Sequence, residues 1–147
     1  MTVERMLAAL QENFDGQPWH GSPLRRLLDG IDDARAHAHP LPAARSIAEL
    51  LAHLSAWIEI ADRRMHGEEF EITPELDFPD ATNARFADLV SQLEWRHASL
   101  LRTVRELGDD GLLRMVRGKP YSIQWMLHGV MHHNTYHAAQ IALLRKS

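Results

Sequence analysis

Four long segments of this chain carry apolar residues at helical spacing, and no segment alternates apolar and polar residues over any length as a strand does. The four segments span about residues 2–33, 46–66, 82–107 and 122 to near the C-terminus. The third is the clearest, because its stripe runs from Phe86 to Leu107 without a gap. The apolar stripe of each helix must be buried against another helix, because exposure of apolar surface to water is unfavourable. The pattern therefore predicts an all-α fold, namely an antiparallel four-helix bundle that forms a single domain over residues 1–147.

The first helix is expected to be interrupted near Gly16 and Gly21. The run GQPWHG contains residues that break a helix. Ser22 followed by Pro23 then supplies a capping residue and a favoured first helical residue, so the helix restarts there. Trp19 in the break is expected to pack on the core. The alternative is a turn that places a polar group over one end of the bundle.

Capping residues mark the ends of the other helices. Ser46 and Glu49 match the Ser-x-x-Glu capping box at the start of the second helix, and Gly67 is expected to end it. The Gly-Asp-Asp-Gly run at 108–111 is expected to stop the third helix. Ser122 can cap the fourth, which should reach almost to the C-terminus.

The composition excludes several kinds of partner and site. The formal net charge is −4 with neutral histidines, so nothing electrostatic points to a nucleic acid as partner. The absence of cysteine excludes disulfides, thiolate zinc sites and cysteine nucleophiles. The first residues lack the apolar segment of a signal peptide, and no stretch reaches the roughly 18 to 20 apolar residues of a membrane span. We therefore expect a cytoplasmic protein that binds neither nucleic acid nor membrane.

The last helix contains four of the ten histidines as two overlapping pairs. His128 with His132, and His133 with His137, are each four residues apart and so share a helix face. A helical wheel separates the pairs. His133 and His137 fall within about 20° of the centre of the apolar stripe, whereas the other two fall on the opposite side. We expect the second pair to face inward.

Two stacked inward imidazoles can bind one divalent metal ion. The alternative is two core histidines that are satisfied by hydrogen bonds, and the residues alone leave both possibilities open. A third ligand is available in His53 of the second helix, on an inward or boundary face; otherwise it is a boundary histidine covered by Trp57. Metal sites in bundles use side chains from facing helices, so His53, His133 and His137 are the candidate metal ligands.

His97 is a fourth candidate because it interrupts the stripe of the third helix. We rank it below His53 as a metal ligand and above it as a residue of the pocket. The alternative is a histidine at the edge of the core with one hydrogen bond. Motifs for serine nucleophiles, phosphate-binding loops and H-E-x-x-H zinc sites are absent.

The sequence resembles the DinB-like (DinB/YfiT) superfamily of small four-helix metalloproteins. Three stretches show the resemblance: WHGSPLRRLLDG near the start, SIAELLAHLSAW around His53, and YSIQWMLHGVMHHNTYHAAQIALLRK at the end. The last is the most specific, since family members commonly end in His-x-x-Tyr-His-x-Gly-Gln-Ile and a basic residue. Here Ala139 stands where glycine is common, a change that touches no candidate ligand.

The resemblance implies a metal triad of one histidine on the second helix and two on the fourth, which correspond to His53, His133 and His137. It also implies a homodimer and one divalent metal ion per chain, with zinc or nickel expected. Imidazole ligands suit several of these ions and do not choose among them.

The resemblance implies one leading function, and two alternatives stand beside it. Members include thiol S-transferases that use bacillithiol or mycothiol and a thiol-dependent maleylpyruvate isomerase, so we expect S-transferase chemistry on a small-molecule substrate, with a low-molecular-weight thiol as cosubstrate. Gln140 and His97 are the candidate catalytic residues: Gln140 would orient a ligand ring or the substrate, and His97 would hydrogen-bond in the pocket. The alternatives are a metal-dependent hydrolase, and a non-enzymatic dimeric module that binds a metal or a small molecule.

Overall fold

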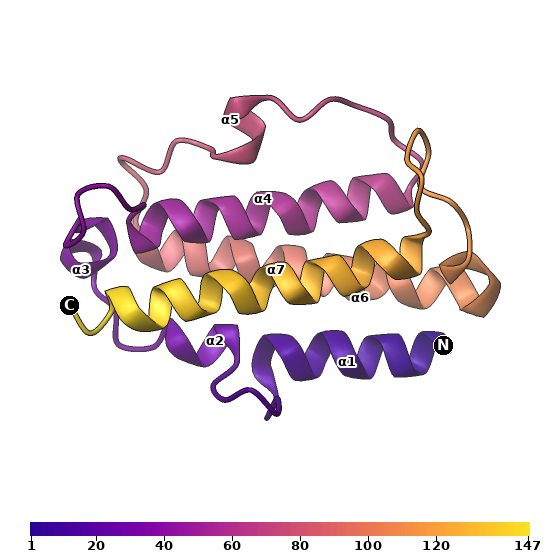
Figure 1. The fold of residues 1–147 in the computed structure, drawn as a ribbon, viewed down its shortest axis with the longest axis horizontal. Helices are drawn as coiled ribbons and strands as arrows, with labels where there is room; N and C mark the ends of the chain where they lie inside the picture. Colours follow the sequence, from indigo (N-terminus) through magenta and orange to yellow (C-terminus); the bar gives the residue numbers. More distant parts are fainter.

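The computed structural model describes all residues, 1–147, and contains seven helices and no strand (Figure 1). The helices are α1 (Val3–Asp15), α2 (Leu24–Leu27), α3 (Asp33–His37), α4 (Ile47–Met65), α5 (Pro74–Asp77), α6 (Phe86–Leu112) and α7 (Ile123–Leu144). The prediction of an all-α fold is confirmed. None of the helices is both long and apolar enough to cross a membrane.

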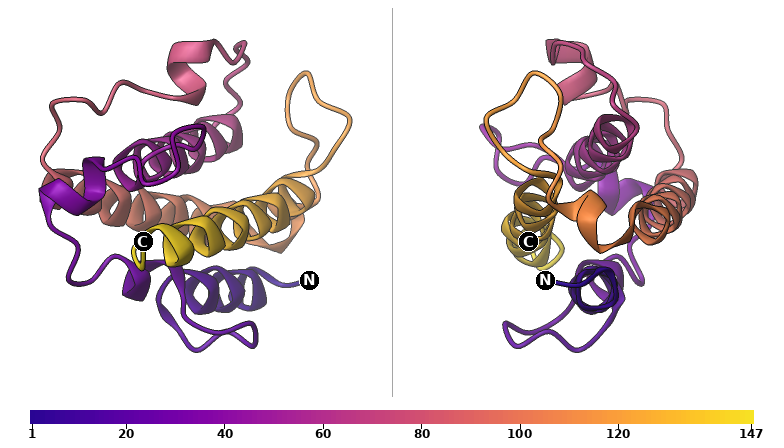
Figure 2. Two further views of the ribbon diagram at one scale, coloured as in Figure 1. Left: turned by 60° about the vertical axis from the view of Figure 1, so that its left-hand side comes forward. Right: turned by 90° about the vertical axis from the view of Figure 1, so that its right-hand side faces the viewer.

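The four long helices pack around one core. Helix α4 contacts α6 and α7, and α1 contacts the same two helices from the other side. A view along the helices shows the four at the corners of a square (Figure 2, right). Met6, Leu51, Leu93 and Leu127 come from one helix each and are completely buried, so all four helices contribute to the same core.

The helix directions differ from the simple antiparallel order that the sequence predicts. Helices α4 and α6 run in the same direction, because α5 and its flanking loops cross back over the molecule between them (Figure 1). Hydrogen bonds between the two helices agree, since Arg96 contacts Ser55 and Thr103 contacts Asp62. Helices α4 and α7 are antiparallel. This pairing brings the middle of α4 opposite the middle of α7.

Helix boundaries follow the capping residues in the sequence. The capping box of Ser46 and Glu49 is formed at the start of α4, and the Ser122 hydroxyl accepts the Trp125 N–H at the start of α7. Helix α6 begins at Phe86, later than expected, and its regular helical backbone is interrupted at Gly108, within the predicted run. Gly108 has φ 68° and ψ 171°, which kinks the helix before one further turn.

The break after α1 contradicts one expectation. Trp19 is fully exposed (103%) and does not pack on the core. The Gly21 N–H donates to the Pro18 carbonyl, which closes a turn with Trp19 in its middle. This turn lies beyond the end of α1, and both of its central side chains, Trp19 and His20, are exposed.

Candidate metal centre

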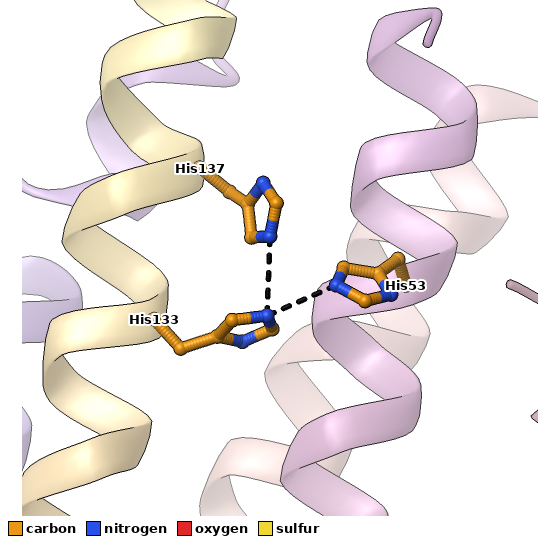
Figure 3. Close-up of side chains that lie close together, drawn as sticks. All are labelled: His53, His133 and His137. Carbon is orange, nitrogen blue, oxygen red and sulfur yellow. Dashed lines mark hydrogen bonds between the residues drawn. The ribbon is translucent and has the colours of Figure 1, made fainter. Parts of the chain in front are cut away.

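Helices α4 and α7 bring three imidazole rings together (Figure 3). The Nε2 atom of His133 lies 2.9 Å from Nε2 of His53 and 3.1 Å from Nε2 of His137. Ligand atoms of all three lie within 4.8 Å of one another, and no other His, Cys, Asp or Glu joins the group. The three residues that the sequence singles out therefore form one cluster.

Two of the rings are held from behind by hydrogen bonds at Nδ1. His53 Nδ1 lies 2.6 Å from the Asp77 carbonyl oxygen, and His137 Nδ1 lies 2.6 Å from Gln140 Oε1. The Asp77 carboxylate in turn accepts a hydrogen bond of 2.8 Å from Trp57 Nε1. Carbonyl and amide oxygens only accept, so both Nδ1 atoms carry the proton. This choice leaves Nε2 of His53 and of His137 as bare acceptors that face the third ring.

The arrangement fits a metal ion better than it fits a hydrogen-bond network. His133 Nε2 can donate at most one proton and has two acceptors beside it, so one short nitrogen–nitrogen contact stays unsatisfied in a neutral cluster. Tetrahedral coordination at about 2.0 to 2.1 Å would place ligand nitrogens roughly 3.3 Å apart, close to the two separations of 2.9 and 3.1 Å from His133 Nε2. A divalent cation would accept all three lone pairs at once.

The electrostatics also favour neutral ligands. Burial, together with the neighbouring rings of His137 and His53, lowers the pKa of His133 to about 4 against the opposing effect of Asp77. Burial likewise lowers the pKa of His137, while its bond to Gln140 acts in the opposite direction. Both rings are thus unprotonated at neutral pH, which is the state that binds metal.

The segment around α5 completes the support of His53, and sequence reasoning missed it. Phe78 stacks on the His53 ring at a centroid distance of 4.0 Å, and the Arg45 guanidinium covers the other face of Phe78. Asp77 contacts His53 Nδ1 through its backbone carbonyl at 2.6 Å and through its carboxylate at 3.3 Å. Every residue type has the carbonyl, so only the acidic side chain was a signal that the sequence could have offered.

The remaining candidates lie elsewhere. His132 is exposed and His128 is only partly buried, so neither reaches the cluster. His97 is buried between α6 and α1, where its ring stacks on Phe14 at 3.9 Å. Neither of its ring nitrogens has a hydrogen-bond partner. It does not line the cavity beside the three histidines.

A cavity of about 290 Å³ opens beside the cluster. His53, His133 and Asp77 line one part of it, and Arg64 and Tyr121 line another. The remaining walls are mainly apolar and come from the facing sides of α4 and α7: Trp57, Ile60, Ala61, Trp125, Met126, Gly129 and Val130. A small molecule bound here would have direct access to His53 and His133.

The DinB superfamily model matches residues 19–141, which is most of the chain. The chain therefore belongs to the DinB superfamily, as the sequence motifs predict. Comparison with curated proteins and with solved structures found no match.

Proposed function

We propose that this DinB-superfamily protein is a metal-dependent enzyme in which His53, His133 and His137 bind one divalent ion, zinc or nickel. The convergence of three Nε2 atoms beside a cavity is the observation that carries the proposal. A structural zinc site normally has four protein ligands, whereas a catalytic site has three and keeps one position free. Three histidines without a fourth side chain match the second pattern.

The proposed reaction is the transfer of a low-molecular-weight thiol to a small electrophilic substrate. A divalent ion at this position supplies Lewis-acid chemistry, which lowers the pKa of a coordinated thiol or water. Gln140 holds the His137 ring in the orientation and tautomer that present Nε2 to the cluster. The apolar walls exclude bulk water from the reacting groups. His97 is left out of this chemistry because it does not line the cavity.

A transfer assay tests the reaction. The metal-loaded protein is incubated with several thiols and an electrophilic acceptor, and conjugate formation is followed. We expect metal-dependent turnover that is lost in the His133→Ala, His137→Ala double variant. Turnover with water in place of a thiol would identify the hydrolase alternative. Stoichiometric metal without any turnover would identify the non-enzymatic binding module.

We further propose that the protein forms a homodimer through an exposed face of α7 that begins beside the mouth of the cavity, where Trp125 lies. Trp125, Tyr136 and Leu143 are 63%, 65% and 71% exposed on this helix, and such large apolar side chains favour a covered position. Sedimentation equilibrium tests the proposal: we expect a dimer that Tyr136→Glu weakens, and a monomeric wild type would contradict it.

A further inference from the structure

One arginine in the cavity is buried without an acidic partner. Arg64 is only 8% exposed, yet no carboxylate lies within 4.0 Å of its guanidinium group. Its one hydrogen bond to another side chain goes from Nη1 to the Tyr121 hydroxyl, at 3.2 Å. Its neighbour Arg63 differs, because it is paired with Glu68 at 2.8 Å.

The guanidinium of Arg64 has unused binding capacity, because only Nη1 has a protein partner and the other two nitrogens are not fully buried. Burial of a charge is costly unless the charge is paired, and arginine offers five N–H donors that match a carboxylate in pairs. The faces of Trp57 and Phe70 lie 6.0 and 5.8 Å from the guanidinium and compensate only part of that cost. Nearby acids are engaged elsewhere, since Glu68 pairs with Arg63 and Glu69 with Arg117.

Arg64 and His53 lie at opposite ends of one face of α4. His53, Trp57, Ile60 and Arg64 follow each other at spacings of four, three and four residues, so their side chains share the side of α4 that lines the cavity. His53 and Arg64 are separated by about 16 Å along the helix axis. Because α7 is antiparallel to α4, His133 lies opposite His53, while Tyr121, just before α7, lies opposite Arg64.

We propose that Arg64, together with the Tyr121 hydroxyl, binds the carboxylate of the substrate, whose apolar body fills the cavity and whose reacting end lies at the three histidines. The assignment of the reacting end rests on the function proposed above. Tyr121 accepts from Arg64 and retains its own hydroxyl proton to donate. Arg64 is the only arginine or lysine that lines the cavity, so a singly charged anion matches it better than a doubly charged phosphate ester.

Binding of ω-mercaptoalkanoates of increasing chain length, and of the corresponding ω-mercaptoalkanols, tests the proposal. Isothermal titration calorimetry on metal-free protein measures the preference for the carboxylate. Arg64→Met removes the proposed site, and Arg63→Met removes an equal charge from the adjacent residue, which does not line the cavity. In cobalt-loaded protein, sulfur-to-cobalt charge-transfer absorption reports separately on the thiol end. Alkyl phosphates form a third arm that distinguishes the two kinds of anion.

We expect the carboxylate to bind roughly 10- to 100-fold more tightly than the alcohol in the wild type and in Arg63→Met, and equally in Arg64→Met. Equal binding in the wild type, a preference that persists in Arg64→Met, tighter binding of the phosphate, or no binding of either compound would overturn the proposal. If the carboxylate preference is observed but no sulfur-to-cobalt absorption appears, the proposed metal chemistry is contradicted and the proposed carboxylate site is not.

Discussion

The molecule has buried histidines in two places: three between α4 and α7, and one, His97, between α1 and α6. The two places share a lowered histidine pKa and differ in how the rings are oriented. The pKa of His133 and the pKa of His97 are both lowered to about 4, and burial is the largest cause in both places. At the cluster, Asp77 and Gln140 orient the rings so that lone pairs converge beside a cavity. His97 stacks on Phe14 with neither nitrogen bonded. A lowered pKa therefore reports burial, and only the convergence of oriented rings indicates a binding site.

Removal of the inner histidine pair should have the largest effect. We expect about one divalent ion per chain in the wild type and almost none in the His133→Ala, His137→Ala variant, because one remaining imidazole cannot hold the ion. The His128→Ala, His132→Ala variant is the matched control, with the same spacing on the same helix. Metal content after dialysis measures both. Stoichiometric metal in the inner-pair variant would contradict the site.

His97 should make its own contribution to the pH dependence of stability. The unfolded imidazole takes up a proton near pH 6.5, whereas folded His97 does so only near pH 4. The unfolded state thus binds more protons between these values, so the free energy of unfolding falls as pH drops from about 6.5 to 4, by up to about 3 kcal/mol from this group. Metal-free His97→Leu should lack this part of the decline.

Chemical denaturation at several pH values measures the difference between His97→Leu and the wild type. His132→Leu, which removes an exposed ring, should follow the wild type. Parallel curves for the wild type and His97→Leu would show that His97 is solvated in the folded protein. Contributions from the three clustered histidines cancel, because they are present in all of these proteins.

Removal of the Gln140 side chain, which holds the His137 ring, should have an intermediate effect on metal affinity. Gln140→Met removes the oxygen that accepts the proton of His137 Nδ1, so the ring can adopt the wrong tautomer or orientation. We expect metal affinity to fall roughly 10- to 100-fold. Gln124→Met on the same helix is the control. Competition with a chromophoric chelator gives the affinities, and equal values for both variants would remove Gln140 from the site.

The smallest expected effect is a change in stability when a methyl group is added at Gly129, which lines the cavity beside the three histidines. A Cβ atom at Gly129 meets nothing within 4 Å, so Gly129→Ala should add about 0.5 to 1 kcal/mol of stability and leave metal content unchanged. Gly111→Ala is the contrast, because its Cβ would lie 2.8 Å from Leu107 Cβ. Thermal unfolding measures both. Loss of stability in Gly129→Ala would mean that the space beside the cluster is already filled.

The sequence predicts side-chain periodicity better than it predicts backbone contacts. The inward direction of His133 and His137 follows from helix geometry, and the capping of α4 follows from Ser46 and Glu49. The contact of the Asp77 carbonyl with His53 was missed, and the acidic side chain beside it, 3.3 Å from His53 Nδ1, was the only signal in that loop. The parallel direction of α4 and α6 was also missed, because an amphipathic stripe is the same in both directions. The long segment between Met65 and Phe86 was the available signal, since it is long enough to return along a helix of about 28 Å.

An anomalous-difference map at the absorption edge of the bound metal tests the three-histidine centre most directly. We predict one peak per chain at about 2.0 to 2.1 Å from Nε2 of His53, His133 and His137, with no fourth protein ligand. A peak between His128 and His132, a fourth protein side chain on the ion, or no peak after incubation with zinc and with nickel would contradict the open three-histidine centre.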